Sequence, residues 1–257
     1  MSLDLERALD VARRAVEAAA AAALPHYERG VEVETKADLS PVTVADRECE
    51  DRILEVITGT FPEHAILGEE TGAHTGTAPY RWTVDPIDGT RGFTRGGKFW
   101  GPLVALEHQG EVLVGAMAMP ALGTVYWAAK GMGAYKDGAR LKVSEVDAWS
   151  KATVSLGEMG PLFGPPHGEA VIDLVRTAAS GRGYGDLMGV AMVLEGLADV
   201  WLEAGVKPWD LGPAPILLQE AGGQFTTFGG AYSIHEGNAV GSNGRLHAHA
   251  LARLSSR

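Results

Sequence analysis

The chain has 257 residues, of which 46% are hydrophobic and 21% charged, as is typical of a globular protein with a sizeable core. Its formal net charge of −11 argues against nucleic acid as a partner, because proteins hold phosphate backbones with basic patches. The single cysteine, Cys49, excludes an internal disulfide and a cysteine-based zinc site. It fits a reducing compartment and is expected to be a small packed residue.

Two helices are predicted in the N-terminal quarter. The first covers residues 3–29 and ends near Gly30, and the second covers 43–57, with the polar loop 36–41 between them. The alanine-rich N-terminus carries four acids and has no uninterrupted apolar stretch of spanning length. It therefore predicts neither a signal peptide nor a membrane span. We expect a cytoplasmic protein with no membrane partner.

Strands dominate the middle of the chain and alternate with helices after it. Short strands are predicted at 65–68 and 82–84, each followed by acids, and an antiparallel meander at 103–135. Helices are expected at 171–180, 188–197 and 216–221, and a strand at 198–203. The pattern of predicted elements changes near residue 143, which predicts two halves, 1–142 and 143–257. We expect them to form one compact α+β unit with mixed sheets and a shared cleft.

One loop, Asp85-Pro-Ile-Asp-Gly-Thr90, combines a candidate cation-binding site with a candidate anion-binding site. Pro86 stiffens the bend that presents the two carboxylates, and Mg²⁺ prefers such oxygen ligands together with substrate phosphate. Gly89 allows the backbone, with its N–H groups, to approach an anion closely. The alternative is an ordinary turn, because Asp-Pro and Asp-Gly steps are common in turns that bind nothing.

Further acids lie at the ends of predicted strands or the starts of helices. Glu69 and Glu70 follow a strand, and because strand residues alternate, only one of them is expected to face a given site. Asp46, in the Thr-x-x-Asp pattern after Thr43, and Asp210 have an alternative role as helix caps. If Glu69 and Asp210 converged on the 85–90 loop, their mutual repulsion would require cations.

The motifs together resemble the inositol monophosphatase family of the fructose-1,6-bisphosphatase superfamily. The resemblance runs nearly from end to end of the chain. It rests on Val-Thr-Val-Ala-Asp46, Gly68-Glu-Glu70, Asp85-Pro-Ile-Asp-Gly-Thr90, Trp209-Asp210 and Glu220-Ala-Gly-Gly223. It implies a layered αβαβα sandwich, a small phosphorylated metabolite as substrate, dependence on two or three Mg²⁺ ions, and commonly a homodimer.

The same resemblance implies roles for individual residues. One Mg²⁺ would be held by Glu69, Asp85 and the carbonyl of Ile87, and a second by Asp85, Asp88 and Asp210; a third, weaker ion is implied beside Glu69. The catalytic set would be Asp46, Thr90 and Glu69, with Thr90, oriented by Asp46, positioning the attacking water. The backbone N–H groups of Gly89 and Thr90 would hold the phosphate.

Residues of the second half favour a particular branch of the family. The Arg182-Gly-Tyr-Gly-Asp186 element, followed by Gly196-Leu-Ala-Asp199 and Glu203, resembles the histidinol-phosphatase branch, and Arg91 points the same way. A cationic substrate would suit Asp186 and Glu203, because carboxylates attract an ammonium or imidazolium group. The segment after Asp186 departs from that branch, since Leu187-Met-Gly-Val190 replaces an aromatic-rich stretch.

Three functions therefore follow from the sequence. The first is a Mg²⁺-dependent histidinol-phosphate phosphatase of histidine biosynthesis, with Gly89, Thr90, Arg91, Asp186 and Glu203 at the substrate. The second is the same chemistry on inositol monophosphate or another sugar phosphate, and the third is a non-catalytic, cation-binding regulatory protein. Finally, the eight histidines show no metal-like pairing, and His247 and His249 are expected at the surface.

Overall fold

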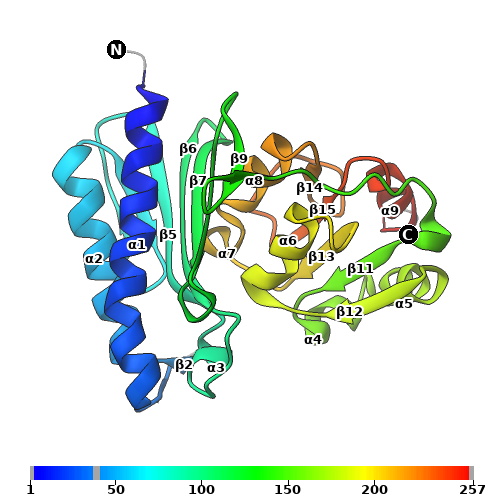
Figure 1. Ribbon diagram of the computed structural model, residues 1–257, viewed down its shortest axis with the longest axis horizontal. Coiled ribbons are helices and arrows are strands. Elements are labelled where there is room, and N and C mark those ends of the chain that lie inside the picture. Colours follow the sequence, from blue (N-terminus) through cyan, green and yellow to red (C-terminus); the bar gives the residue numbers. More distant parts are fainter. Residues whose placement is uncertain (1–2, 37–40, 255–257) are drawn as a thin grey trace.

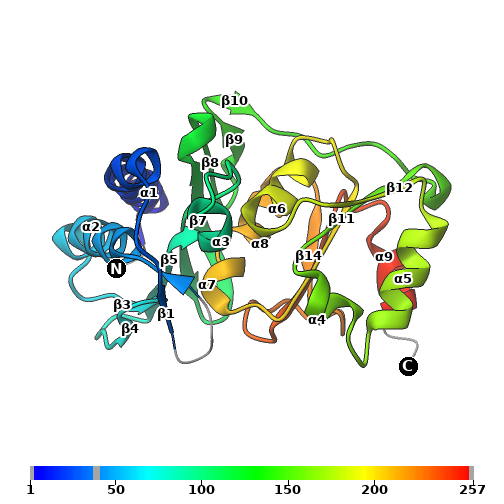
Figure 2. The same cartoon turned by 90° about the horizontal axis from the view of Figure 1, so that it is seen from below.

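The computed structural model describes residues 3–36 and 41–254 of the chain. They form alternating layers of helix and sheet, which Figures 1 and 2 show edge-on. From the N-terminal side the order is a helix pair, an eight-stranded sheet, a central helix layer, a five-stranded sheet and an outer helix pair. The predicted α+β class and αβαβα sandwich are confirmed.

The first layer consists of α1 (Leu5–Arg29) and α2 (Val44–Thr60). Small buried residues recur along α1 at helical spacing, so α2 packs closely against it, and buried Cys49 donates its thiol hydrogen to the Ala19 carbonyl at 3.3 Å. Both helices were predicted, although α2 runs three residues past Ile57. In the described ranges, no helix has the length and apolar character that crossing a bilayer requires.

The eight-stranded sheet carries the first group of functional loops. Its order is β10-β9-β8-β7-β6-β5-β3-β4, and β3 and β5 are its parallel pair. The bounds are β3 Ala65–Gly68, β4 Gly72–His74, β5 Tyr80–Asp88, β6 Gly101–His108, β7 Glu111–Met119, β8 Thr124–Ala129, β9 Gly133–Lys136 and β10 Ala139–Arg140. The predicted meander is confirmed. β5 is longer than predicted, because it continues past a register shift between Asp85 and Asp88.

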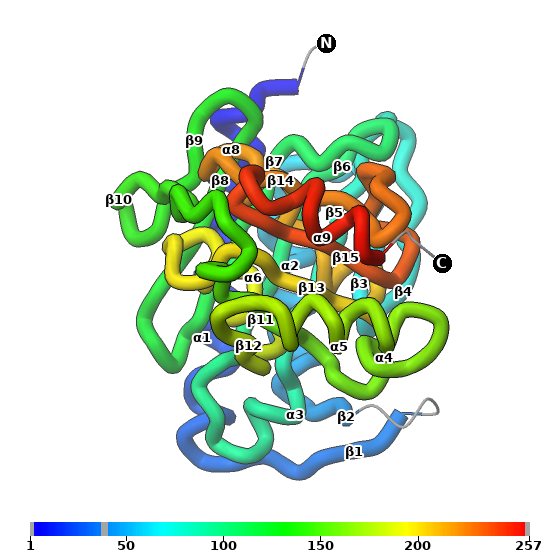
Figure 3. The backbone as a smooth tube through the Cα atoms, turned by 90° about the vertical axis from the view of Figure 1, so that its right-hand side faces the viewer, coloured from blue at the N-terminus to red at the C-terminus, as the bar shows by residue number. Residues whose placement is uncertain are grey.

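The five-stranded sheet has the order β12-β11-β13-β15-β14. α6 and α8 lie between the two sheets, and Figure 3 shows α5 and α9 on the far face. The strands are β11 Thr153–Leu156, β12 Ser180–Gly183, β13 Val200–Ala204, β14 Gln224–Thr226 and β15 Asn238–Ser242, and the helices α5 Gly168–Thr177, α6 Asp186–Leu194, α8 Ala214–Glu220 and α9 His247–Leu254.

Short elements complete the structure. β1 and β2 pair as a separate two-stranded sheet beside the site. These elements are β1 Glu34–Thr35, β2 Pro41–Val42, α3 Thr90–Phe93, α4 Met159–Phe163, α7 Pro208–Leu211 and the 3₁₀ turns Pro120–Leu122 and Trp149–Lys151. Residues 37–40 of the predicted loop lie outside the described residues, and Pro41 belongs to β2 rather than to a loop.

Three hydrophobic clusters bind the layers together. One joins α1 and α2 to the larger sheet through residues such as Ile53 and Trp82. The second fills the space between the sheets around α6 and α8 and includes Trp201. The third joins the smaller sheet to α5 and α9 and includes Leu174. Because the central cluster holds the two sheets together, their loops are fixed relative to each other at the shared edge.

Several predicted boundaries were wrong. The helix expected at 171–180 ends at Thr177, and Ser180 already begins β12. The other expected elements are shifted by one to three residues at their ends, as α6, α8 and β13 show. The division into 1–142 and 143–257 stays a prediction, although the gap between the two sheets, from Arg140 to Thr153, includes that boundary.

The expectation that His247 lies at the surface was wrong. Its ring is buried, with Nδ1 2.9 Å from Ser242 Oγ and Nε2 2.9 Å from Thr226 Oγ1, and burial lowers its pKa to about 4. His249 is half-buried and stacks on Trp149 with ring centroids 4.5 Å apart. Both rings therefore pack α9 against the smaller sheet and its neighbours.

Candidate active site

A cleft of about 320 Å³ opens where loops from both sheets meet. Its lining contains seven carboxylates and, among the described residues, one cationic side chain, Arg91. The seven are Glu69, Asp85, Asp88, Glu158, Asp186, Glu203 and Asp210. So many acids in one cavity would repel one another, so the cleft is suited to cationic ligands.

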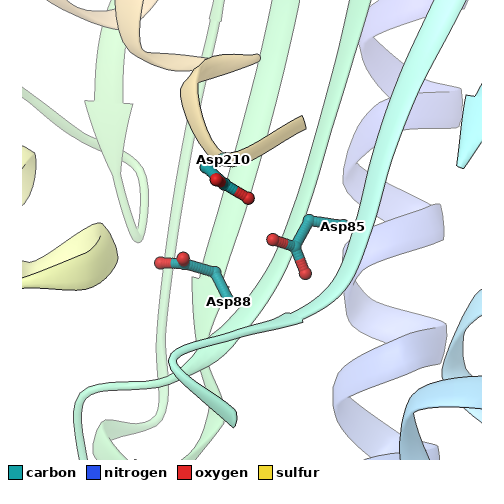
Figure 4. A group of neighbouring side chains, drawn as sticks. All are labelled: Asp85, Asp88 and Asp210. Atoms are coloured by element: carbon teal, nitrogen blue, oxygen red, sulfur yellow. The ribbon is translucent and has the colours of Figure 1, made fainter. Parts of the chain in front are cut away.

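Asp85, Asp88 and Asp210 form the centre of this acidic lining. One carboxylate oxygen of each lies within 4.8 Å of the others, and Figure 4 shows the three side chains facing one another from the end of β5 and from α7. Backbone N–H groups orient each of them. Ile87 donates to Asp85 Oδ1 at 3.0 Å, Leu187 to Asp88 Oδ2 at 2.5 Å, and Lys207 to Asp210 Oδ2 at 2.7 Å.

The charges of these three groups explain what the cluster can hold. Burial, together with the neighbouring carboxylates, raises the pKa of Asp85 and Asp88 well above the usual aspartate value, and burial also raises the pKa of Asp210. A hard divalent cation would remove this repulsion and accept oxygen ligands in such an arrangement. The residues present therefore fit Mg²⁺. Asp210 also caps its own one-turn helix, not the following helix as the capping alternative supposed.

Glu69 lines the same cleft but is bound to a lysine. Lys36 Nζ lies 2.8 Å from Glu69 Oε1 and 2.5 Å from Glu70 Oε1. Burial raises the pKa of Glu69 to about 7, and the Lys36 ammonium opposes that rise. Strand alternation is not the reason that the two side chains differ, because β3 ends at Gly68 and the pair lies in a turn. Both carboxylates meet one ammonium group, yet only Glu69 lines the cleft, so the expectation that one of the pair faces the site is confirmed.

Asp46 both caps α2 and contacts Thr90. Its Oδ2 accepts the backbone N–H and the hydroxyl of Thr43, both at 2.7 Å, which completes a capping box. Its Oδ1 lies 3.3 Å from the Thr90 hydroxyl, which donates to the Ile87 carbonyl at 2.9 Å. The two readings of Asp46 are therefore compatible, because each uses a different carboxylate oxygen. Thr90 stands between two acceptors at the edge of the cleft.

Gly89 is required where β5 turns into α3. Its φ of 80° is left-handed, and a Cβ there would lie 2.7 Å from the Phe99 carbonyl oxygen. Thr90 and Arg91 follow as the first residues of α3, and all three line the cleft. The N–H groups in the first turn of a helix have no partner within it, so such a turn favours an anion at its N-terminal end.

Acids of the smaller sheet form the opposite side of the cleft. Glu203, on β13, is 4% exposed, and its Oε1 accepts the N–H groups of Glu158 at 2.8 Å and Ala204 at 3.2 Å. Burial raises its pKa to about 8. Asp186, at the start of α6, has a positive φ of 43°, and burial and the nearby Glu158 raise its pKa to about 6. The structure brings both predicted residues into the cleft.

Sequence analysis missed Glu158 and Lys36. Glu158 follows β11 at its carboxyl end, beside the parallel strand β13 that carries Glu203, and such edges gather functional side chains. A predicted strand at 153–156 would have indicated it. Lys36 carried no signal, because its partnership with Glu69 depends on how β1 and β2 fold beside the larger sheet.

Comparison with known proteins identifies this arrangement. The model of the inositol monophosphatase family matches residues 4–257. The chain belongs to this family. It is therefore a phosphomonoesterase, and its substrate is a phosphorylated metabolite. The family uses metal ions, in keeping with the Asp85, Asp88 and Asp210 cluster. The non-catalytic alternative is thus not supported.

Two relatives of this phosphatase are named histidinol-phosphatases. That of Mycobacterium tuberculosis is 40% identical over 87% of this chain and 88% of its own length, and that of Streptomyces coelicolor is 36% identical over 97% of both. Among solved structures, the inositol monophosphatase from Anabaena superposes with a TM-score of 0.86 and 28% identity. That match covers 98% of this chain and 97% of the other.

Proposed function

We propose that this phosphatase hydrolyses histidinol phosphate with the help of Mg²⁺. The observation that carries the proposal is that the cleft contains two groups of carboxylates, each suited to a different positive charge. Three carboxylates meet within 4.8 Å, and Asp186 and Glu203 add an acidic wall to the same cleft. The first suits a cation that attends the phosphate, and the second suits a positively charged alcohol. The names of the relatives at 36–40% identity support this substrate.

Residues on the larger sheet and α7 would hold the cations. We assign one Mg²⁺ to Glu69, Asp85 and the Ile87 carbonyl, a second to Asp85, Asp88 and Asp210, and a third, weaker ion to a position beside Glu69. When bound, Mg²⁺ supplies positive charge to the phosphate and acidity to water. The Lys36 ammonium would compete with a cation for Glu69, because its Nζ lies 2.8 Å from Glu69 Oε1.

The chain's own groups would position the ester and move one proton. The N–H groups of Gly89 and Thr90 would hold the phosphate oxygens, with Arg91 nearby, so the phosphorus is presented to water in line with the leaving alcohol. The Thr90 hydroxyl would take up the water's proton as its own passes to Asp46 Oδ1, 3.3 Å away. Burial raises the pKa of Asp46, which favours its acceptance of a proton.

The acidic wall would select the alcohol. Asp186 lies beside the phosphate loop, because a Cβ on Gly89 would come within 3.2 Å of its Oδ2. A carboxylate so placed can receive the ammonium group of histidinol phosphate. Inositol offers hydroxyl groups instead, which Glu203 could bind equally well. Glu203 therefore suits both esters, whereas Asp186 favours the cationic one.

A comparison of two substrates tests the proposal. We expect kcat/KM for histidinol phosphate to exceed that for inositol 1-phosphate by about tenfold or more, the ratio that one charge-assisted hydrogen bond supplies. A preference for the inositol ester would establish inositol monophosphatase activity instead. The assembly is proposed to be a homodimer, which light scattering after gel filtration would test; a monomeric mass would contradict it.

A further inference from the structure

Glu50 is a fully buried carboxylate on α2, one helical turn after Asp46. A buried charge is costly unless hydrogen bonds compensate for it, and Glu50 has three. Its Oε2 accepts the Glu70 N–H at 2.8 Å, and its Oε1 accepts the Thr71 N–H at 2.8 Å and the Thr71 hydroxyl at 2.5 Å. All three donors belong to the turn that joins β3 to β4.

That turn carries Glu69 into the cleft. On one side of it, the Glu69 N–H donates to the Val84 carbonyl of β5 at 3.1 Å. On the other side, Glu50 holds the next two N–H groups, as an anion is held in a nest of backbone amides. The fit is close, since a Cβ on Gly68 would lie 2.2 Å from Glu50 Oε1. The backbone around Glu69 is thus fixed from both directions.

We propose that Glu50 is a positioning residue that sets where the Glu69 carboxylate enters the cation site. The inference rests on the proposed role of Glu69 as a ligand. Asp46 and Glu50 stand four residues apart, so they share one face of α2. Asp46 contacts Thr90, and Glu50 fixes the turn of Glu69. One helix face therefore aligns the proton acceptor with a ligand from a different loop.

The chain contains a matched control. Glu220, at the end of α8, also holds a turn, since its two carboxylate oxygens accept the N–H groups of Gly131 at 2.7 Å and Gly133 at 2.6 Å. It is not among the residues that line the cleft. Glu220→Gln therefore removes a carboxylate that accepts two backbone N–H groups, as Glu50→Gln does, but from a turn without a proposed cation ligand. Thr71→Val provides a milder probe, because it removes one of the three donors from an exposed residue.

The test measures Mg²⁺ affinity by calorimetry without substrate, together with kcat, KM and the melting temperature. We expect Glu50→Gln to weaken Mg²⁺ binding about 10- to 100-fold, as loss of an outer partner of a ligand does. The KM measured at saturating Mg²⁺ should change little, because the phosphate loop is untouched. Thr71→Val should also weaken Mg²⁺ binding, but by a smaller factor. Glu220→Gln should lower the melting temperature and leave Mg²⁺ affinity unchanged.

The inference is overturned if folded Glu50→Gln binds Mg²⁺ as tightly as the wild type, or if Glu220→Gln weakens binding equally. If Glu50→Gln does not fold, Thr71→Val decides, and unchanged Mg²⁺ affinity in that variant counts against the proposal. Failure of the proposed function would be visible in the wild type alone. A wild type that neither binds Mg²⁺ nor releases phosphate contradicts both.

Discussion

Asp186 shows at the scale of one residue how strain and charge coincide at the cleft. Its left-handed backbone is rare for residues other than glycine, and its carboxylate lies among other acids, Glu158 and Asp210, at the cleft. Neither feature stabilises the fold in an obvious way. Both are consistent with a side chain held ready for a cationic ligand, in accordance with the proposed recognition of an ammonium group.

Replacing Asp186 tests that recognition. Asp186→Asn keeps the shape and removes the charge, so KM for histidinol phosphate should rise about tenfold or more, the value of one charge-assisted hydrogen bond. KM for inositol 1-phosphate, which carries no cation, should change much less. Steady-state kinetics with both esters gives the two ratios, and equal effects on both would refute the role of Asp186.

The sequence predicted the individual acids of the cluster better than it predicted their surroundings. Asp85 and Asp88 were indicated by a local motif, and Asp210 by a Trp-Asp step, because each lies at an abrupt change of local structure. Lys36 acts through a partner distant in the chain, so no local pattern marks it, and Glu158 was missed because the strand before it was not predicted. The burial of His247 was also missed, since its partners Thr226 and Ser242 are polar residues on two other elements.

At the scale of an element, the segment from β11 into α4 controls Glu203. Gly157 lies opposite that carboxylate, and a Cβ there would come 1.6 Å from Glu203 Oε2. The next residue, Glu158, donates its N–H to Glu203 Oε1. The end of β11 therefore leaves space for the Glu203 carboxylate and anchors it at the same time.

A pair of glycine variants tests this arrangement. Gly157→Ala should displace Glu203, lower stability by about 1–3 kcal/mol, the typical cost of overpacking, and reduce kcat/KM. Gly160→Ala, in α4, has open space around its Cβ and should stabilise by about 0.5–1 kcal/mol without changing activity. Denaturant melts and kinetics on the pair check both. A Gly157→Ala protein as stable and active as the wild type would contradict the account.

Long elements were predictable and short ones were not. The alanine spacing of α1 and the alternating strands of the meander are strong local signals, and both elements formed where expected. β12 begins at Ser180, where a helix was expected to end, because pairing with β11 selects an extended backbone there. The two-residue strands β1, β2 and β10 form through tertiary pairing and carry no periodicity.

At the scale of the whole molecule, the layers place a cavity of seven carboxylates between two sheets. Three hydrophobic clusters hold the layers together and offset the repulsion concentrated in that cavity. Stability without a cation must therefore depend on protonation of these acids. For Glu203 the pKa of about 8 in the fold lies above its ordinary value of 4.5. Its contribution to folding stability is therefore fully present below pH 4.5 and is lost as the pH rises through 8.

This linkage predicts the pH dependence of the metal-free protein. Between pH 6.5 and 8 the melting temperature in EDTA should fall, because Glu203 and Glu69, whose pKa is about 7, must ionise in the fold. His247, whose pKa burial lowers from 6.5 to about 4, makes the fold more stable as the pH rises, but only below pH 6.5. Glu203→Gln should show a shallower decline, and added Mg²⁺ should restore stability most at pH 8. A melting temperature that is constant or rises over this range would be incompatible with the raised pKa values.

Phosphate release from histidinol phosphate by the wild type and Asp88→Asn, with Mg²⁺ and with EDTA, tests the central claim most directly. The wild type should release phosphate in Mg²⁺, stop in EDTA and recover when Mg²⁺ is restored. Asp88→Asn should be nearly inactive, yet melt in EDTA at or above the wild-type temperature, because a repelling charge is gone. Turnover that survives EDTA, or wild-type rates in Asp88→Asn, would contradict the account.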